Sequence, residues 1–132
     1  MSAKPISEFD AKTLVCFHLG SAAAVCAIHA ETHSEAHVRF AEAETQHPWL
    51  QTTMLVVKPD QLIKRRGKLG LVAVNLTWEN AKTWILARVG TSVHVENTVG
   101  VLDTFIVEPF VKHAQDMEFY ICIQSLREVL VV

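Results

Sequence analysis

A basic loop between two apolar, β-branched segments constrains the fold of this chain more than any other feature. Residues 54–57 and 71–76 have the composition of buried strands, and we predict that they pair in one sheet. Between them, residues 58–68 hold five of the twelve Lys and Arg residues against one Asp, a local charge of +4. Glycines at positions 67 and 70 allow the backbone to approach an anion closely. The sequence therefore predicts a strand, loop and strand that grip a polyphosphate.

The rest of the chain is acidic. The formal net charge is −2, so the residues outside 58–68 carry −6, which is −2 minus +4. Such a field disfavours general binding to nucleic acid or to anionic membranes, because both partners repel negative charge. With 132 residues the chain has the size of one domain and can bury a core.

The basic loop also carries a resemblance to a known family. The string LVVKPDQLIKRRGKLGLVAVNL begins at residue 55, HPWL precedes it, and FIVEPFVKHAQDMEFYICI follows from residue 105. These strings resemble the amino-terminal end of the ATP-citrate lyase (ATP-citrate synthase) family, strongly from residue 47 to about 128. The resemblance persists in the opening MSAKPISEFDAKTL and is weak from residue 15 to about 46. More remotely, the chain is similar to the β subunit of succinyl-CoA synthetase, of the ATP-grasp superfamily.

This resemblance implies an ATP-grasp-like fold, in which nucleotide lies between two lobes and the smaller lobe covers the phosphates. We expect residues from about 20 to 102 to form the lid lobe. Residues 1–19 and 103–132 would begin the larger lobe, most of which would lie outside this chain. Independently of the family, the alternation of helical and strand patterns predicts an α/β or α+β class with a mixed sheet.

For the phosphate end of a nucleotide, the resemblance implies contacts from Lys58, Arg66 and Gly67. Lys58 would meet the α and β phosphates, Arg66 would offer a bidentate fork, and Gly67 would present a backbone N–H. Without the family, Lys58 reads as a solvated strand-end lysine, and KRRGK reads as a nuclear-localisation or nucleic-acid patch. Its other cations, at positions 64, 65 and 68, would add electrostatic field more than contact.

For the base and the ribose, the resemblance implies contacts from Pro109, Val111 and Glu118. The segment VEPFV at residues 107–111 resembles a hinge whose backbone groups read the adenine edge, so Pro109 and Val111 would act through their main chain. Glu118 would accept hydrogen bonds from ribose hydroxyls. The alternative for Glu118 is a solvated charge at a strand start, and His113 stays unassigned.

Local signals predict further elements. Ser7 followed by Asp10 resembles a helix N-cap. Thr77 should cap a helix that carries Trp78, with Gly90 as its C-terminal cap. Additional strands are expected at residues 92–96, 104–107 and 119–124.

The run from residue 14 to residue 30 lacks Asp, Glu, Lys and Arg, which raises the alternative of a membrane or signal segment. Its length of 17 residues and its internal His18 and His29 favour a buried helix instead, and Gly20 and Ser21 should interrupt the helix that begins near Ser7. A composition rich in Ala, Glu and His extends the helical prediction over residues 22–44, and Pro48 should end it.

Three histidines, His29, His33 and His37, recur at intervals of four and would line one face of such a helix. Glutamates between them favour a solvated face over a metal site. The cysteines are Cys16, Cys26 and Cys122, without CxxC spacing, and we predict buried thiols in a reducing cytosol.

Taken together, the resemblance implies the nucleotide-binding part of an enzyme that uses ATP to activate citrate as citryl phosphate, yielding acetyl-CoA and oxaloacetate with CoA. It implies ATP as cofactor, Mg²⁺ held by ligands outside this chain, a homo-oligomeric full enzyme and a cytosolic location. No catalytic residue is assigned, because the family's catalytic groups belong to later sequence. The alternative is a truncated, non-catalytic module that associates with full-length subunits through apolar surface.

Overall fold

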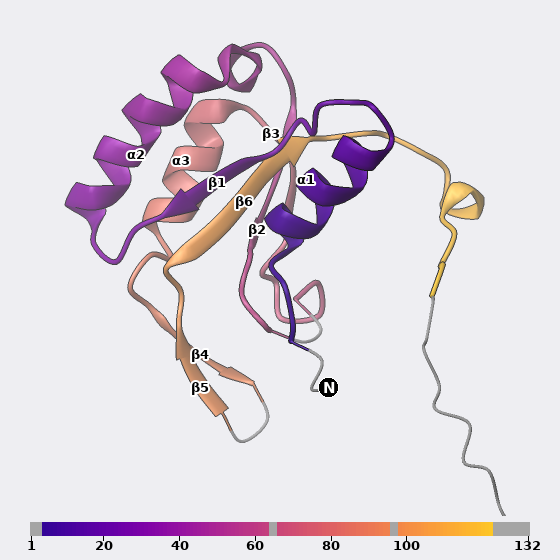
Figure 1. Cartoon of the computed structure of the whole chain (residues 1–132). Coiled ribbons are helices and arrows are strands. Elements are labelled where there is room, and N and C mark those ends of the chain that lie inside the picture. The colour runs from indigo at the N-terminus through magenta and orange to yellow at the C-terminus, as the bar shows by residue number, and fades with distance from the viewer. Residues whose placement is uncertain (1–3, 64–65, 96–97, 123–132) are drawn as a thin grey trace, which may run out of the picture.

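An antiparallel sheet separates two helices on one face from a third helix on the other (Figure 1). The computed structural model describes residues 4–63, 66–95 and 98–122. Within these ranges the helices are α1 (Glu8–His18), α2 (His33–Gln46) and α3 (Trp78–Leu86), with 3₁₀ turns at Pro48–Gln51 and Gln115–Met117. The strands are β1 (Cys26–His29), β2 (Leu55–Pro59), β3 (Ala73–Leu76), β4 (Ser92–Val95), β5 (Thr98–Val101) and β6 (Thr104–Pro109). The predicted α+β class is confirmed.

The main sheet has the strand order β1-β6-β2-β3. Val107 in the central strand β6 lies opposite Cys26 in β1 and Val57 in β2. Every strand pair in the described ranges is antiparallel, so the predicted mixed sheet is wrong in this respect. Neighbouring strands here need no helical crossover of the kind that parallel pairing requires. The lid lobe was expected to end near residue 102, so β6 would belong to the larger lobe. In the structure β6 lies between β1 and β2, and the main sheet therefore spans this boundary.

The predicted pairing of the two apolar segments around the basic loop is confirmed as β2 with β3. Their register shifts by one residue between Leu55 and Val57, where Asn75 adopts φ 58°. An extra residue in β3 at this point is a β-bulge, and asparagine tolerates the left-handed conformation. The two strands flanking the basic loop are thus held in one sheet.

The core lies between the sheet and helices α2 and α3. Strand β2 alternates, with Leu55, Val57 and Pro59 buried and Val56 and Lys58 half-buried. Alternate strand residues face opposite sides of a sheet, so the first set meets the core and the second meets the face on which α1 lies. Phe40 of α2 and Trp78 of α3 pack edge to face in the core at 5.6 Å between ring centroids.

The amino-terminal third differs from the prediction. The interruption predicted at Gly20 and Ser21 is confirmed, because α1 ends at His18 and Gly20 turns the chain with φ 69°. The helix expected beyond it, over residues 22–30, is wrong. The chain then enters β1, whose alternating burial suits a strand covered on one face. No helix within the described ranges is long and apolar enough to cross a membrane.

The histidine spacing was misleading because residues 26–29 form a strand and not part of a helix. His29 belongs to β1, whereas His33 and His37 lie on α2, so the three do not share one helix face. Within residues 4–63, 66–95 and 98–122, no group of three or more His, Cys, Asp or Glu residues could hold a metal ion. The buried-thiol prediction holds for Cys26, but Cys16 is half-buried and Cys122 is exposed.

Helix capping followed the sequence closely. Ser7 caps α1 by accepting from the Asp10 N–H, and Thr77 caps α3 by accepting from the Asn80 N–H. The helix before Pro48 ends at Gln46, as predicted. Gly90 has φ 74° but lies beyond the end of α3 at Leu86, and its N–H donates to the Leu102 carbonyl.

Two other strand predictions changed. The strand expected at 92–96 is β4 up to Val95, and position 96 lies outside the described residues. Residues 119–122 are not in a strand, so that part of the predicted strand 119–124 is wrong, and its remainder lies outside the described residues. These four residues are all exposed.

Candidate functional site

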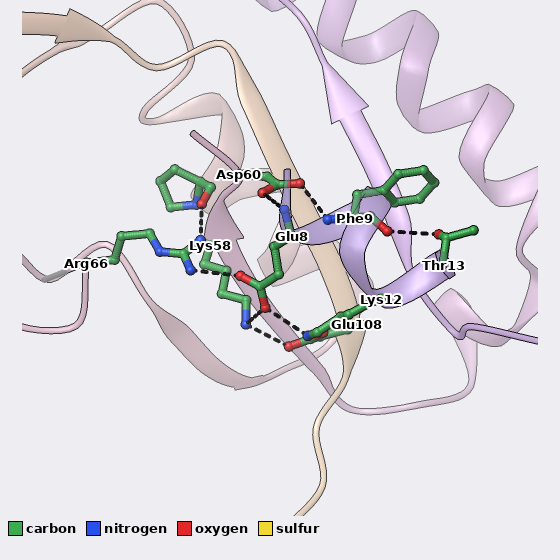
Figure 2. Close-up of polar contacts among 9 residues, drawn as sticks. Glu8, Phe9, Lys12, Thr13, Lys58, Asp60, Arg66 and Glu108 are labelled. Atoms are coloured by element: carbon green, nitrogen blue, oxygen red, sulfur yellow. Dashed lines mark hydrogen bonds and ion pairs between the residues drawn. The ribbon is translucent and has the colours of Figure 1, made fainter. Parts of the chain in front are cut away.

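Oppositely charged side chains gather on the α1 side of the sheet. We call this group the α1 cluster, and its members come from α1, β2, β6 and the loop after β2 (Figure 2). The cluster comprises Glu8, Lys12, Lys58, Arg66 and Glu108.

The carboxylate of Glu8 lies at the centre of the α1 cluster. One oxygen, Oε1, is 2.8 Å from Lys12 Nζ and 2.6 Å from Lys58 Nζ, and the other, Oε2, is 2.7 Å from an Arg66 guanidinium nitrogen. Burial raises the pKa of Glu8, but hydrogen bonds from these three cations outweigh it and lower the pKa to about 2. Glu8 is therefore ionised at neutral pH.

Glu108 completes the α1 cluster from β6. Its carboxylate accepts from Lys58 Nζ at 2.9 Å and from Lys12. The side chains of Lys58 and Glu108 are each only 16% exposed. Both lie on the face of the sheet that is turned away from α2 and α3. Burial lowers the pKa of Lys12, whereas hydrogen bonds to Glu108 and Glu8 raise it more. The cluster carries three cations and two carboxylates, hence a formal charge of +1.

A second nitrogen of the Arg66 guanidinium also makes a hydrogen bond. It donates to the Pro59 carbonyl at 2.6 Å, so the loop that follows β2 folds back onto the strand end. The neighbouring residues 64 and 65, predicted to add electrostatic field, lie outside the described residues. Gly67 is exposed, and among the described residues a Cβ placed there would meet no atom within 4 Å.

Asp60 anchors the start of α1 to the loop after β2. Its carboxylate accepts the backbone N–H of Glu8 at 2.7 Å and that of Phe9 at 2.9 Å (Figure 2). These donors have no partner inside the helix, so a carboxylate satisfies them and complements the helix dipole. Asp60 is 9% exposed.

A cavity of about 760 Å³ adjoins the α1 cluster between the start of α1 and the loop after β2. Its lining includes both polar and apolar side chains: Pro5, Ile6, Ser7, Glu8, Ala11, Asp60, Gln61, Leu62, Ile63 and Arg66. Glu8 and Arg66 therefore border both the cavity and the ion-pair cluster.

The remaining predicted site residues lie at the end of β6 and beyond it. Pro109 ends β6 opposite Leu55 of β2, and Val111 is exposed just beyond it. His113 links Val111 to Glu118, because its Nδ1 is 2.8 Å from the Val111 carbonyl and its Nε2 is 2.7 Å from the Glu118 carboxylate. Both ring nitrogens face acceptors, and the hydrogen bonds to Glu118 and Val111 raise the pKa of His113.

The structure therefore brings four of the six predicted residues into two groups. Lys58 and Arg66 meet through Glu8, and Val111 and Glu118 meet through His113. Sequence reasoning missed Glu8, Lys12 and Glu108. The spacing of Glu8 and Lys12 by four residues on a predicted helix was an available signal for an ion pair.

A second polar cluster lies on the opposite side of the sheet from α1. Lys82 of α3 is 3.0 Å from Glu44 and 2.7 Å from Glu79, and Trp78 donates its indole N–H to Glu44 at 2.7 Å. Its members connect helices α2 and α3. This cluster offers matched control residues for the α1 cluster.

Comparison with known proteins identifies a family over almost the whole chain. The model of the ATP-citrate synthase ATP-grasp domain matches residues 2–132. The chain is 45% identical to ATP-citrate synthase of Homo sapiens over 128 residues, covering 97% of this chain and 12% of that protein. It is 40% identical to the probable ATP-citrate synthase subunit 2 of Schizosaccharomyces pombe, covering 97% of this chain and 32% of that protein.

Solved structures agree with this comparison. The fold matches ATP citrate lyase from Methanothrix soehngenii, in complex with citrate and coenzyme A, with a TM-score of 0.72 and 36% identity. The match covers 83% of this chain and 26% of that one. The chain thus spans about a third or less of the length of these relatives.

Proposed function

This chain belongs to the family of ATP-citrate synthase ATP-grasp domains, and we propose that it binds ATP on the α1 face of its sheet. The single observation that carries the proposal is the convergence of Lys58 and Arg66 on one carboxylate. Two separate segments each deliver a donor to one of the two oxygens of Glu8, and a phosphate group can accept from lysine and arginine in a similar way.

Strand register supports one direction for the proposed nucleotide. Pro109 is opposite Leu55, three residues before Lys58 on β2. Three residues along a strand span roughly 10 Å. An elongated nucleotide would lie along β2 and β6, with its phosphates at Lys58, Arg66 and Gly67 and its base at the backbone of Pro109 and Val111. Glu118 would accept from the ribose hydroxyls.

These residues would act by positioning and by neutralising charge. Lys58 supplies a point charge from a rigid strand, and Arg66 supplies a planar fork braced by the Pro59 carbonyl. Phosphoryl transfer depends mainly on such positioning and electrostatic stabilisation. Bound ATP would supply the phosphoryl group, and Mg²⁺ would be held by residues of the family outside this chain.

For the whole enzyme we propose the family reaction, in which citrate, CoA and ATP yield acetyl-CoA and oxaloacetate in the cytosol of a homo-oligomeric protein. In this proposal, residues 1–132 alone bind nucleotide weakly and do not cleave citrate. The division into a lid lobe at about 20–102 and the start of a larger lobe belongs to the same proposal, although β6 joins the two parts in one sheet.

A second function is favoured by a separate observation, the exposed apolar residues of α1 and of residues 117–121. Phe17 is 74% exposed and Tyr120 is 90% exposed. A surface of this kind suits association with another protein chain. The chain would then be a non-catalytic module that associates with full-length subunits.

Titration of ATP into the 132-residue chain, followed by NMR shift changes, tests the nucleotide proposal. Lys58→Ala and Arg66→Ala should each weaken binding about tenfold or more, because each removes a charge-assisted hydrogen bond. Lys82→Ala is the matched control, since it removes a paired lysine on the other side of the sheet. Equal affinity in all three variants would remove the phosphate assignment.

A further inference from the structure

Glu8 occupies the positions that a phosphate group would take between Lys58 and Arg66. Each of its two carboxylate oxygens accepts from at least one of these cations, at 2.6 and 2.7 Å (Figure 2). A phosphate oxygen accepts from lysine and arginine with the same geometry. The anion already present and the proposed ligand therefore use the same donors.

The net charge of the α1 cluster depends on whether Glu8 is in place. The α1 cluster carries a formal charge of +1 with both glutamates in place. Removing Glu8 from it would leave +2 from Lys12, Lys58, Arg66 and Glu108. A polyphosphate would thus meet a more positive site once Glu8 has left, and it would supply the counter-charge that Glu8 had given.

Glu8 is carried by an element that is suited to move. None of the residues in α1, all of which the structure describes, is buried. Ion pairs and hydrogen bonds connect α1 to the sheet and to the loop after β2. Glu8 pairs with Lys58 and Arg66, Lys12 pairs with Glu108, and two backbone N–H groups donate to Asp60. Loss of the Glu8 contacts would remove much of what holds the first turn.

We propose that Glu8 is an internal competitor of phosphate, and that nucleotide binding displaces its carboxylate and releases the first turn of α1. This inference rests on the proposed nucleotide function, whose regulation it describes. Apparent affinity is the intrinsic affinity reduced by the fraction of molecules in which the cations are open. The opposite role for Glu8, that of holding Lys58 and Arg66 ready for the ligand, predicts an effect of opposite sign.

The test compares Glu8→Gln with the unmodified chain, using ATP and inorganic tripolyphosphate as separate probes. Glutamine keeps the size of the side chain and removes the negative charge. If Lys58 and Arg66 are open in about one molecule in ten, Glu8→Gln should bind both probes about tenfold more tightly. Glu79→Gln, which removes an exposed carboxylate from Lys82, should leave both affinities unchanged.

Amide hydrogen exchange supplies the second readout. Saturating tripolyphosphate should increase exchange at residues 9–13 of the unmodified chain, while β2 and β6 stay protected. Asp60→Asn provides a second variant that retains every charge of the α1 cluster and weakens the attachment of α1. It should also tighten binding, by less than Glu8→Gln does, and protection of β2 and β6 shows whether either variant is folded.

The outcomes separate this inference from the nucleotide proposal. If ATP binds the unmodified chain and both variants bind it equally or more weakly, Glu8 is not a competitor, although the nucleotide function stands. A second outcome is that the variants bind tripolyphosphate more tightly than the unmodified chain does, while their affinity for ATP does not exceed their affinity for tripolyphosphate. In that case Glu8 is a phosphate competitor and base recognition is refuted. If neither probe binds any folded variant, both proposals are overturned.

Discussion

A carboxylate such as Glu8 shows how one residue can depend on partners from three separate segments. It pairs with Lys12 within its own helix, with Lys58 of β2 and with Arg66 of the following loop. Partial burial alone would favour the neutral acid, so these partners decide its ionisation. Removing the charge from this one side chain should therefore lower the stability near neutral pH and matter less in acid.

The acid dependence of Glu8→Gln tests this point. Because the folded-state pKa of about 2 lies below the ordinary 4.5, the contribution of Glu8 is complete above 4.5 and is lost as the pH falls toward 2. The difference in unfolding free energy between the unmodified chain and Glu8→Gln should be constant near neutral pH and shrink below 4.5. Urea unfolding at a series of pH values measures it.

Glu79→Gln serves as the control for that series, since Glu79 is an exposed partner of Lys82 and exposed pairs contribute little. A difference for Glu8→Gln that stays constant down to about pH 2 would contradict the assigned ion-pair geometry.

Cysteine reactivity is a second prediction at the residue scale. Burial raises the pKa of Cys26 to about 11, whereas Cys122 is exposed and Cys16 is half-buried. The thiolate is the reactive form, so alkylation by iodoacetamide should be fastest at Cys122, slower at Cys16 and slowest at Cys26. Mass spectrometry of partially labelled native protein gives the three rates. In urea the rates should converge, and native labelling of Cys26 as fast as that of Cys122 would refute the burial of β1.

Helices α1 and α3 differ in what holds them to the sheet. Helix α3 buries Trp78, Ala81 and Ile85 in the core, so its attachment is hydrophobic. Helix α1 buries no residue, and its apolar Leu14 and Phe17 are more than half exposed. Polar contacts at its first two turns therefore determine whether it stays attached. An element of this kind should open locally before the molecule unfolds.

Asp60→Ala should reveal that local opening. It removes the acceptor of the Glu8 and Phe9 N–H groups, and loss of a helix cap costs about 0.5–2 kcal/mol. Amide exchange within α1 should accelerate by about twofold to thirtyfold, which is this free-energy range converted to an opening equilibrium, while β2 and β6 change less.

The matched control for Asp60→Ala is Thr77→Ala, which removes the side-chain acceptor of one first-turn N–H of α3, that of Asn80. Because α3 is held by buried side chains, its amides should open together with the sheet and not separately. Equal acceleration in α1 and β6 on Asp60→Ala would mean that α1 belongs to the cooperative core.

The whole molecule has a well-buried core on one side of its sheet and an incompletely covered surface on the other. Phe105, Leu55 and Ile28 are fully buried between the sheet and helices α2 and α3. By contrast, large apolar residues are exposed along α1 and at 117–121. Strands β1 and β3 are the outer strands of the main sheet, and such edges can pair with another chain.

Self-association is therefore expected for the 132-residue chain. Sedimentation velocity across a concentration series should show a mass that rises with concentration, because the exposed apolar surface is removed from water on association. Phe17→Asp should shift the equilibrium toward monomer. Val38→Asp adds the same charge at an exposed position of α2 and should have little effect. A monomer at every concentration would contradict this reading of the surface.

Local signals predicted those parts of the fold that are decided by neighbouring residues. Ser7 and Thr77 were recognised as caps because capping involves a side chain and a backbone N–H three residues away. The strands around the basic loop were recognised because an apolar, β-branched segment favours buried strand structure wherever it occurs. Composition failed at residues 22–30, where the strand β1 depends on pairing with β6, almost eighty residues later.

The sequence by itself determined the family, the basic loop with its flanking strands, and the residue types at six candidate positions. Only the tertiary structure decided that Lys58 pairs with Glu8 and Glu108, each about fifty residues away along the chain, and that Arg66 pairs with Glu8. The physical reason is range. Periodicity and capping report on groups within a few residues, whereas an ion pair depends on where packing brings distant segments together.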